Sequence, residues 1–267
     1  MTTYLSMTEL GPELSYLNRN SFFLKAAFVI LSLAPLYAQN HISVDSTWTE
    51  DITLTGDIII DAGVTLTINS GITIKVVPID TDVDGIGDID IIVNGSLEVL
   101  GAENSLVYFI PYDTSSAVVT NKDWGGIDIN TATGSVMFSH VFIGWANVGV
   151  DVQSGNVKIF HSEIANVHDF GLKLSMAAED SLIINDLDIN NSAEIGIVLE
   201  GNSDSFLSAV SVSSCDSIAV LIQDSNSTNT QIVSSTIENN NGLGILIQES
   251  TPTFENCLIS NNGVGGV

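Results

Sequence analysis

Three side chains that can carry a proton or bind a metal recur at one position of a repeated pattern: His140, His161 and Asp186, each three residues before an isoleucine. Histidine and aspartate serve as general acids and bases, and neutral imidazole is a common metal ligand. In later repeats the same position holds Ala209, Ser234 and Asn256, a series typical of a turn. We therefore predict a turn column with paired histidines, and a transition-metal or acid–base site is the alternative. His168 stands in a different turn and does not join the column.

A second group of candidate ligands lies in an acidic loop at residues 79–90. Its residues at positions one, three, five, six and nine of a calcium-loop pattern are Asp80, Asp82, Asp84, Gly85 and Asp88. Alternating hard oxygen ligands followed by a glycine for the sharp turn match the front half of such a loop. The stretch resembles the aspartate-rich calcium repeats of thrombospondin type 3 and dockerin-like modules, but Ile91 replaces the bidentate Glu of an EF-hand at position twelve. We predict calcium binding at Asp80, Asp82, Asp84 and Asp88, with a solvated acidic surface loop as the alternative.

The charge balance of the chain limits the classes of molecule that it can bind. Six Lys and Arg residues stand against 32 Asp and Glu residues, which gives a net charge of −26. Binding to phosphate needs clustered basic residues, so we predict no nucleic-acid partner. Beyond residue 38 the basic residues are Lys75, Lys122, Lys158 and Lys173. They are scattered, whereas proton abstraction beside a uronate needs a positive centre, and we therefore assign no catalytic residues.

The elements that must position these residues follow from an internal repeat. A small residue within a short apolar segment recurs at Gly126, Gly149, Gly171, Gly196, Ala219, Gly244 and Gly265. The steps are 21 to 25 residues, and the segments between show a period of two rather than a helical period. Short strands joined by tight turns at this period form one coil of a solenoid. We predict an all-β chain that forms a right-handed parallel β-helix, a β-solenoid, with irregular N-terminal coils.

Polar residues mark the turns of the predicted coils. Five residues before the small residue stand Asn166, Asn191, Ser214 and Asn239. Asparagine tolerates the left-handed conformation of a sharp bend, so we predict a turn ladder; sugar binding by these amides is the alternative.

The two cysteines, Cys215 and Cys257, fall two coils apart. Layers roughly 9 to 10 Å apart are too distant for a disulfide, and we predict that both are free.

Several segments of the N-terminal half carry a family resemblance. They are Gly63–Ile68 with Gly71, Val93–Leu97 with Gly101, Val107–Phe109 and Trp124–Ile127. Together with the later repeats they resemble secreted bacterial right-handed parallel β-helix repeat proteins of the pectate-lyase-like superfold. The resemblance covers about residues 46 to 267 and implies the fold. Members of this group include lyases, epimerases and adhesin-like surface proteins, so the resemblance does not imply one activity.

The ends of the chain predict its compartment and its domain order. Arg19, Lys25 and an apolar run before Ala38 have the order of a secretory signal at about 19–38, and a buried N-terminal helix is the alternative. We expect an extension and signal at 1–38, an N-terminal cap with the first coils at 39–120, and β-helix repeats at 121–267.

A new repeat begins at Asn261 and stops, so we expect C-terminally incomplete repeats and end-to-end self-association through an open coil. No membrane span is expected after signal removal.

These observations predict a secreted or cell-surface, calcium-stabilised β-helix module. Its expected role is structural or adhesive, or the binding of an extracellular glycan or surface protein. The alternative is a polysaccharide lyase or glycoside hydrolase whose active coils lie partly outside this chain. A groove lined by aromatic residues and opposed acids would favour the enzyme, whereas flat polar ladders would favour the module.

Overall fold

The computed structural model describes residues 40–114, 120, 122–176, 180–201, 204–223 and 230–263. By its contacts the chain divides into two units, Met1–Ala38 and Gln39–Val267. The expected signal at 19–38 and residues 264–267 lie outside the described residues.

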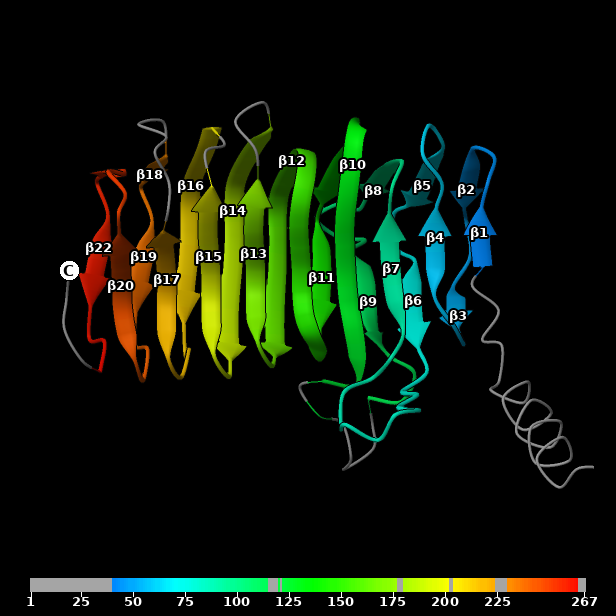
Figure 1. The fold of residues 1–267 in the computed structure, drawn as a ribbon, viewed down its shortest axis with the longest axis horizontal. Coiled ribbons are helices and arrows are strands. Elements are labelled where there is room, and N and C mark those ends of the chain that lie inside the picture. The colour runs from blue at the N-terminus through cyan, green and yellow to red at the C-terminus, as the bar shows by residue number, and fades with distance from the viewer. Residues whose placement is uncertain are drawn as a thin grey trace, which may run out of the picture. The chain divides into compact units, whose positions relative to one another are not determined.

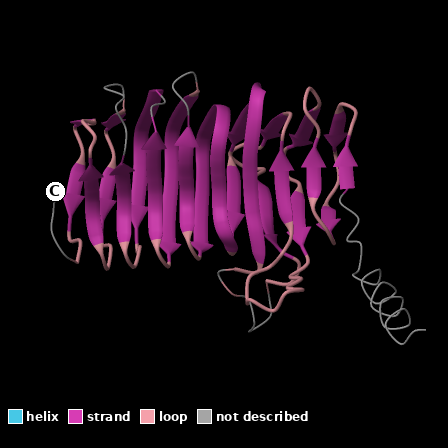
Figure 2. Ribbon diagram, in the orientation of Figure 1, coloured by secondary structure: helices cyan, strands magenta, loops and turns pink. Residues whose placement is uncertain are grey.

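Every regular element in the described residues is a β-strand, and the strands wind around one axis (Figure 1, Figure 2). The strands form one continuous hydrogen-bonded array, and each coil contributes one segment to each of its three parallel faces, which we call sheets A, B and C. This arrangement confirms the predicted right-handed parallel β-helix. The long strands β10, β12, β14 and β16 run through the corners and therefore belong to more than one sheet.

The strands of each sheet follow one another coil by coil. Sheet A contains β1 (Asn40–Ile42), β4 (Ile58–Ile60), β7 (Asp90–Val93), the first parts of β10 (Trp124–Ser139) and β12 (Ala146–Val167), β13 (Phe170–Met176), β15 (Ile195–Gly201), β17 (Ile218–Gln223) and β20 (Leu243–Gln248). Sheet B contains β2 (Ser46–Trp48), β5 (Thr65–Asn69), β8 (Ser96–Leu100), the end of β10, the middle of β12, the first halves of β14 (Ser181–Ser192) and β16 (Asp204–Ser213), β18 (Gln231–Val233) and β21 (Thr253–Glu255). Sheet C contains β3 (Ile52–Leu54), β6 (Thr73–Val76), β9 (Val107–Pro111), β11 (Val141–Gly144), the ends of β12, β14 and β16, β19 (Thr236–Glu238) and β22 (Leu258–Ser260).

The core consists of columns of aliphatic side chains that stack along the axis. One column of sheet A contains Ile60, Val93, Ile129, Val152, Leu174, Leu199 and Ile222. Each of these side chains is at most 3% exposed. Burying one Val, Leu or Ile contributes about 1.5–3 kcal/mol, so the stacked columns supply the main stabilisation of the solenoid. A single coil has no such partner, which is why the coils require one another.

From His140 onward, two corners of each described coil use one residue in the left-handed conformation, as the repeat predicts. At the corner between sheets B and C the φ angles are 49° to 64° for His140, His161, Asp186, Ala209, Ser234 and Asn256. At the corner between sheets C and A they are 55° to 59° for Asn166, Asn191, Ser214, Asn239 and Asn261. Asn191 Nδ2 donates to Asn166 Oδ1 at 2.6 Å, so these two corner amides also join neighbouring coils. Both predicted turn columns are confirmed.

The small residue of the repeat is required by the distance between coils. A Cβ atom added at Gly149 would lie 2.4 Å from the carbonyl oxygen of Gly171, and one at Gly171 would lie 2.6 Å from that of Gly196. Such distances are far inside van der Waals contact, so a larger side chain would push adjacent coils apart. The glycines that reveal the period in the sequence are therefore those that permit close stacking.

Both cysteines are free, as their register predicts. Cys215 lies in the corner between sheets C and A, and its backbone N–H donates to Asn240 Oδ1 at 2.9 Å. Burial raises the pKa of the Cys215 thiol to about 11. Cys257 is partly exposed. A buried thiol with a raised pKa, as at Cys215, is a poor nucleophile.

Candidate functional site

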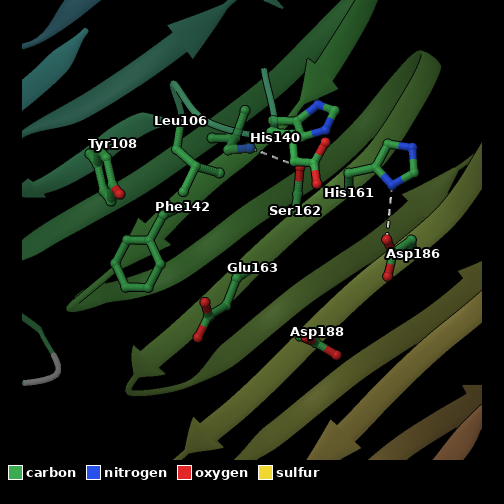
Figure 3. A pocket seen from close by; sticks show the side chains of 11 residues that line it. Leu106, Tyr108, His140, Phe142, His161, Ser162, Glu163, Asp186 and Asp188 are labelled. Carbon is green, nitrogen blue, oxygen red and sulfur yellow. Dashed lines mark hydrogen bonds and ion pairs between the residues drawn. The ribbon is translucent and has the colours of Figure 1, made fainter. Parts of the chain in front are cut away.

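A groove of about 700 Å³ lies on the outer surface of sheet C, beside its corner with sheet B (Figure 3). Strands β9, β11, β12 and β14 provide most of its walls, and the turn that contains Glu103 and Leu106 adds to its lining. This volume falls within the range of ligand-binding clefts. Because the coils stack in parallel, the side chains in the groove form two rows along the axis.

The first row occupies one outward position of four successive coils. Its members are Tyr108, Phe142, Glu163 and Asp188. The ring centroids of Tyr108 and Phe142 are 5.9 Å apart with an interplanar angle of 45°. Trp145, at the end of the same coil as Phe142, lies 5.8 Å from Phe142 by ring centroids. The row therefore changes from aromatic to acidic along the groove, as Figure 3 shows.

The second row is the corner column of His140, His161 and Asp186. The two imidazole rings stack with centroids 4.8 Å apart and an interplanar angle of 32°. His161 Nδ1 lies 2.8 Å from Asp186 Oδ2, and because a carboxylate only accepts, His161 carries its proton on Nδ1. In neutral His161 this leaves Nε2 as a proton acceptor. His140 Nδ1 lies 3.1 Å from Ser139 Oγ.

Hydrogen bonds from the scaffold hold the floor of the groove. Ser162 Oγ donates to the carbonyl of Phe160 at 2.8 Å and accepts from the N–H of Val141 at 3.1 Å. Asn190 Nδ2 donates to Glu163 Oε1 at 2.9 Å. Each of these residues stands on a strand rather than on a loop. The groove is therefore built on rigid elements, which limits the entropy lost on binding.

The repeat pattern of the sequence indicated only part of this groove. It singled out His140, His161 and Asp186, and the structure brings these three together. It missed Tyr108, Phe142, Glu163 and Asp188. A signal was present, because Phe142, Glu163 and Asp188 each stand two residues after a corner residue and must point outward beside it. His168 pairs instead with Asp169, with Nδ1 at 2.6 Å from Oδ1, in a different turn.

The acidic loop between β6 and β7 brings together three of the four predicted calcium ligands. Carboxylate oxygens of Asp80, Asp82 and Asp88 lie within 4.8 Å of one another, and all three residues are exposed. Asp88 Oδ2 also accepts from the N–H of Thr81 at 2.7 Å. Asp84 lies outside this group, and its Oδ1 accepts from the N–H of Ile86 at 2.8 Å. Three clustered carboxylates are a donor set that fits a hard cation.

A separate group of carboxylates lies on the outer face of sheet A. Asp128, Asp151 and Lys173 occupy one position in three successive coils, and Lys173 Nζ lies 3.2 Å from Asp151 Oδ2. Burial, and then the charge of Asp151, raises the pKa of Asp128 above its ordinary value. Burial, followed by the charges of Asp128, Asp57 and Asp88, raises the pKa of Asp90 to about 7. These groups face away from the groove, because they belong to another sheet.

Comparisons with known proteins agree with the architecture. Among the residues that the structure describes, no helix has the length and hydropathy needed to span a bilayer. No curated protein and no solved structure shows significant similarity to the chain. The model of one protein family, described as the right handed beta helix region, matches residues 125–267, which is more than half of the chain. The chain therefore belongs to the right-handed β-helix family.

Proposed function

We propose that this β-helix binds glycans in the groove of sheet C. The observation that carries the proposal is the row of Tyr108 and Phe142, whose rings lie 5.9 Å apart on consecutive coils beside acidic and imidazole groups. The weakly polar C–H faces of sugar rings stack on aromatic rings, while their hydroxyl groups need hydrogen-bond partners. The groove offers both, and its rows run parallel to the axis along which an extended chain would lie.

The proposed setting is the cell surface or the extracellular space, supported by the signal-like order of residues 19–38. Calcium bound by Asp80, Asp82 and Asp88 would stabilise the loop that precedes β7. Without a cation, three exposed carboxylates within 4.8 Å repel one another. The ion would contribute charge neutralisation there, and the groove on sheet C would bind its ligand through its own side chains.

A second candidate function is glycoside hydrolysis. It is favoured by the carboxylates of Glu163 and Asp188, which stand on consecutive coils in the same groove as the His161–Asp186 pair. Hydrolysis needs two carboxyl groups on opposite sides of a glycosidic bond, one of them protonated. The aromatic lining of the groove meets one half of the criterion for an enzyme, but Glu163 and Asp188 stand in one row on neighbouring coils rather than opposed, so binding is the first candidate. Elimination from a uronate is a weaker candidate, since none of the described residues that line the groove is a lysine or arginine.

Binding is tested with the full chain on an array of neutral, acidic and amino-substituted oligosaccharides, followed by calorimetry on the hits. Phe142→Ala should weaken binding of any hit at least tenfold, because it removes a stacking surface. The matched control is Phe206→Ala, a 40% exposed phenylalanine on sheet B, which should bind as the parent chain does. A hit whose affinity is unchanged by Phe142→Ala would contradict the proposal. Reducing-end release from the same hits would support hydrolysis instead of binding alone.

A further inference from the structure

The groove has a charge pattern that selects among glycans. Four carboxylates line it, namely Glu103, Glu163, Asp186 and Asp188, and none of the described lining residues is basic apart from its two histidines. A uronate or sulfated sugar would meet repulsion at Glu103, Glu163 and Asp188, which have no lysine or arginine beside them in the lining. A neutral sugar would meet no repulsion, but none of its groups would form an ion pair with the carboxylates. Only a cationic sugar would complement this lining.

The position of the acids relative to the aromatic rings sharpens this choice. Glu163 follows Phe142 by one coil in the same row, and Asp188 follows Glu163 by one further coil. Neighbouring coils are about 4.8 Å apart, so a ring stacked on Phe142 would present its next substituents to Glu163. Asn190 holds Glu163 from one side through a 2.9 Å hydrogen bond. The carboxylate is therefore fixed along the direction in which a bound chain would continue.

Resting on the proposed glycan binding, we infer that the ligand is an amino sugar polymer with free, protonated amino groups. The C–H face of one ring stacks on Tyr108 and Phe142, and the ammonium groups of neighbouring rings pair with Glu163 and Asp188. Charge-assisted hydrogen bonds of this kind are short and strong. A flexible polycation without rings would satisfy the acids but would gain nothing from the aromatic row.

The test compares two probes that differ only in the amine: an oligomer of glucosamine and its fully N-acetylated counterpart, titrated into the full chain by calorimetry at pH 6. The glucosamine oligomer should bind at least tenfold tighter at low salt, and this preference should shrink with added salt. Glu163→Gln and Asp188→Asn should each weaken binding of the glucosamine oligomer about tenfold and thereby remove most of its preference over the acetylated oligomer. Glu98→Gln, which removes an outward carboxylate from sheet B, is the matched control and should change neither affinity.

The outcomes separate this inference from the proposed function. Equal or tighter binding of the acetylated oligomer, with loss of binding in Phe142→Ala, overturns the amino-sugar assignment and leaves glycan binding intact. A lysine oligomer of equal charge that binds as tightly, with no effect of Phe142→Ala, overturns it in favour of a polycation surface. If neither oligosaccharide binds, and Phe142→Ala is without effect on any hit of the array, both proposals fail.

Discussion

His161 and Asp186 join two neighbouring coils through a 2.8 Å contact between Nδ1 and Oδ2, and both residues are in the left-handed conformation at their corners. Their side chains are 50% and 57% exposed. An ion pair in this setting contributes little to stability, because water screens it. The contact therefore fixes the orientation of the two side chains at the groove and adds little to the stability of the stacked coils.

The first prediction follows from this pair. His161→Asn should leave the free energy of unfolding within about 0.5 kcal/mol of the parent chain, because the exposed pair contributes little and asparagine suits the corner conformation. Urea unfolding followed by circular dichroism measures it. A loss of more than about 2 kcal/mol would show that the pair stabilises the stack, contrary to this reading.

The second prediction concerns the only alanine in the described corner column between sheets B and C. Ala209 has a φ of 53°, where a Cβ atom costs roughly 1–2 kcal/mol and glycine pays no such penalty. Ala209→Gly should raise stability by up to about 1 kcal/mol after the entropy cost of glycine. Ala219→Gly, at a buried strand position, is the matched control and should lower it. Equal destabilisation in both variants would contradict the strain argument.

The third prediction uses the raised pKa of Asp128. Folding favours the protonated form of this carboxyl, so its contribution to stability is fully present below about pH 4 and is lost as the pH rises through the folded pKa. Asp128→Asn should therefore be more stable than the parent chain near pH 8, and the difference should vanish toward pH 4. Urea midpoints at several pH values measure this, with the exposed Glu50→Gln as control. A difference independent of pH would exclude burial of a protonated carboxyl.

The fourth prediction separates the ligands of the acidic loop. Millimolar calcium should raise Tm relative to a chelator, since binding to the native state stabilises it by mass action. Asp82→Asn should remove most of this shift, whereas Asp84→Asn should retain it, because Asp84 lies outside the convergent group. Differential scanning fluorimetry compares the three chains. The absence of any calcium shift in the parent chain would end the calcium proposal.

The fifth prediction concerns the thiols. At pH 8 a soluble disulfide reagent should modify Cys257 in the folded chain, while Cys215 should react only after unfolding, because burial raises its pKa to about 11. Absorbance of the released thiolate measures the number of groups. Cys257→Ser should remove the fast phase, and rapid modification of two groups in the native chain would contradict the burial of Cys215.

The sequence allowed the architecture and both corner columns to be predicted, because these depend on local rules that repeat. Asn166 and Asn191 mark one corner by their tolerance of positive φ, and Gly171 marks the close approach of the next coil. The corner column of His140, His161 and Asp186 was predicted, but the groove beside it was not. Glu163 and Asp188 are two acids among many in the sequence, and only the register between coils places them beside Phe142.

The acidic loop shows a similar limit. Spacing alone treats Asp84 and Asp88 as equivalent ligands. The structure separates them, because carboxylate oxygens of Asp88 converge with those of Asp80 and Asp82, whereas Asp84 lies outside this group. Which carboxylates converge depends on the path of the backbone in a loop without repeats, and that path follows from its own hydrogen bonds rather than from a period.

The outward row of sheet C continues past Asp188 as Ser211, Thr236 and Leu258, one residue for each further coil. Each position can change without disturbing the core, because its side chain points away from the buried columns. Each outward position of the row can therefore be substituted independently of the others and of the core. Substitutions at these three positions would therefore lengthen the recognition surface while the scaffold stays the same.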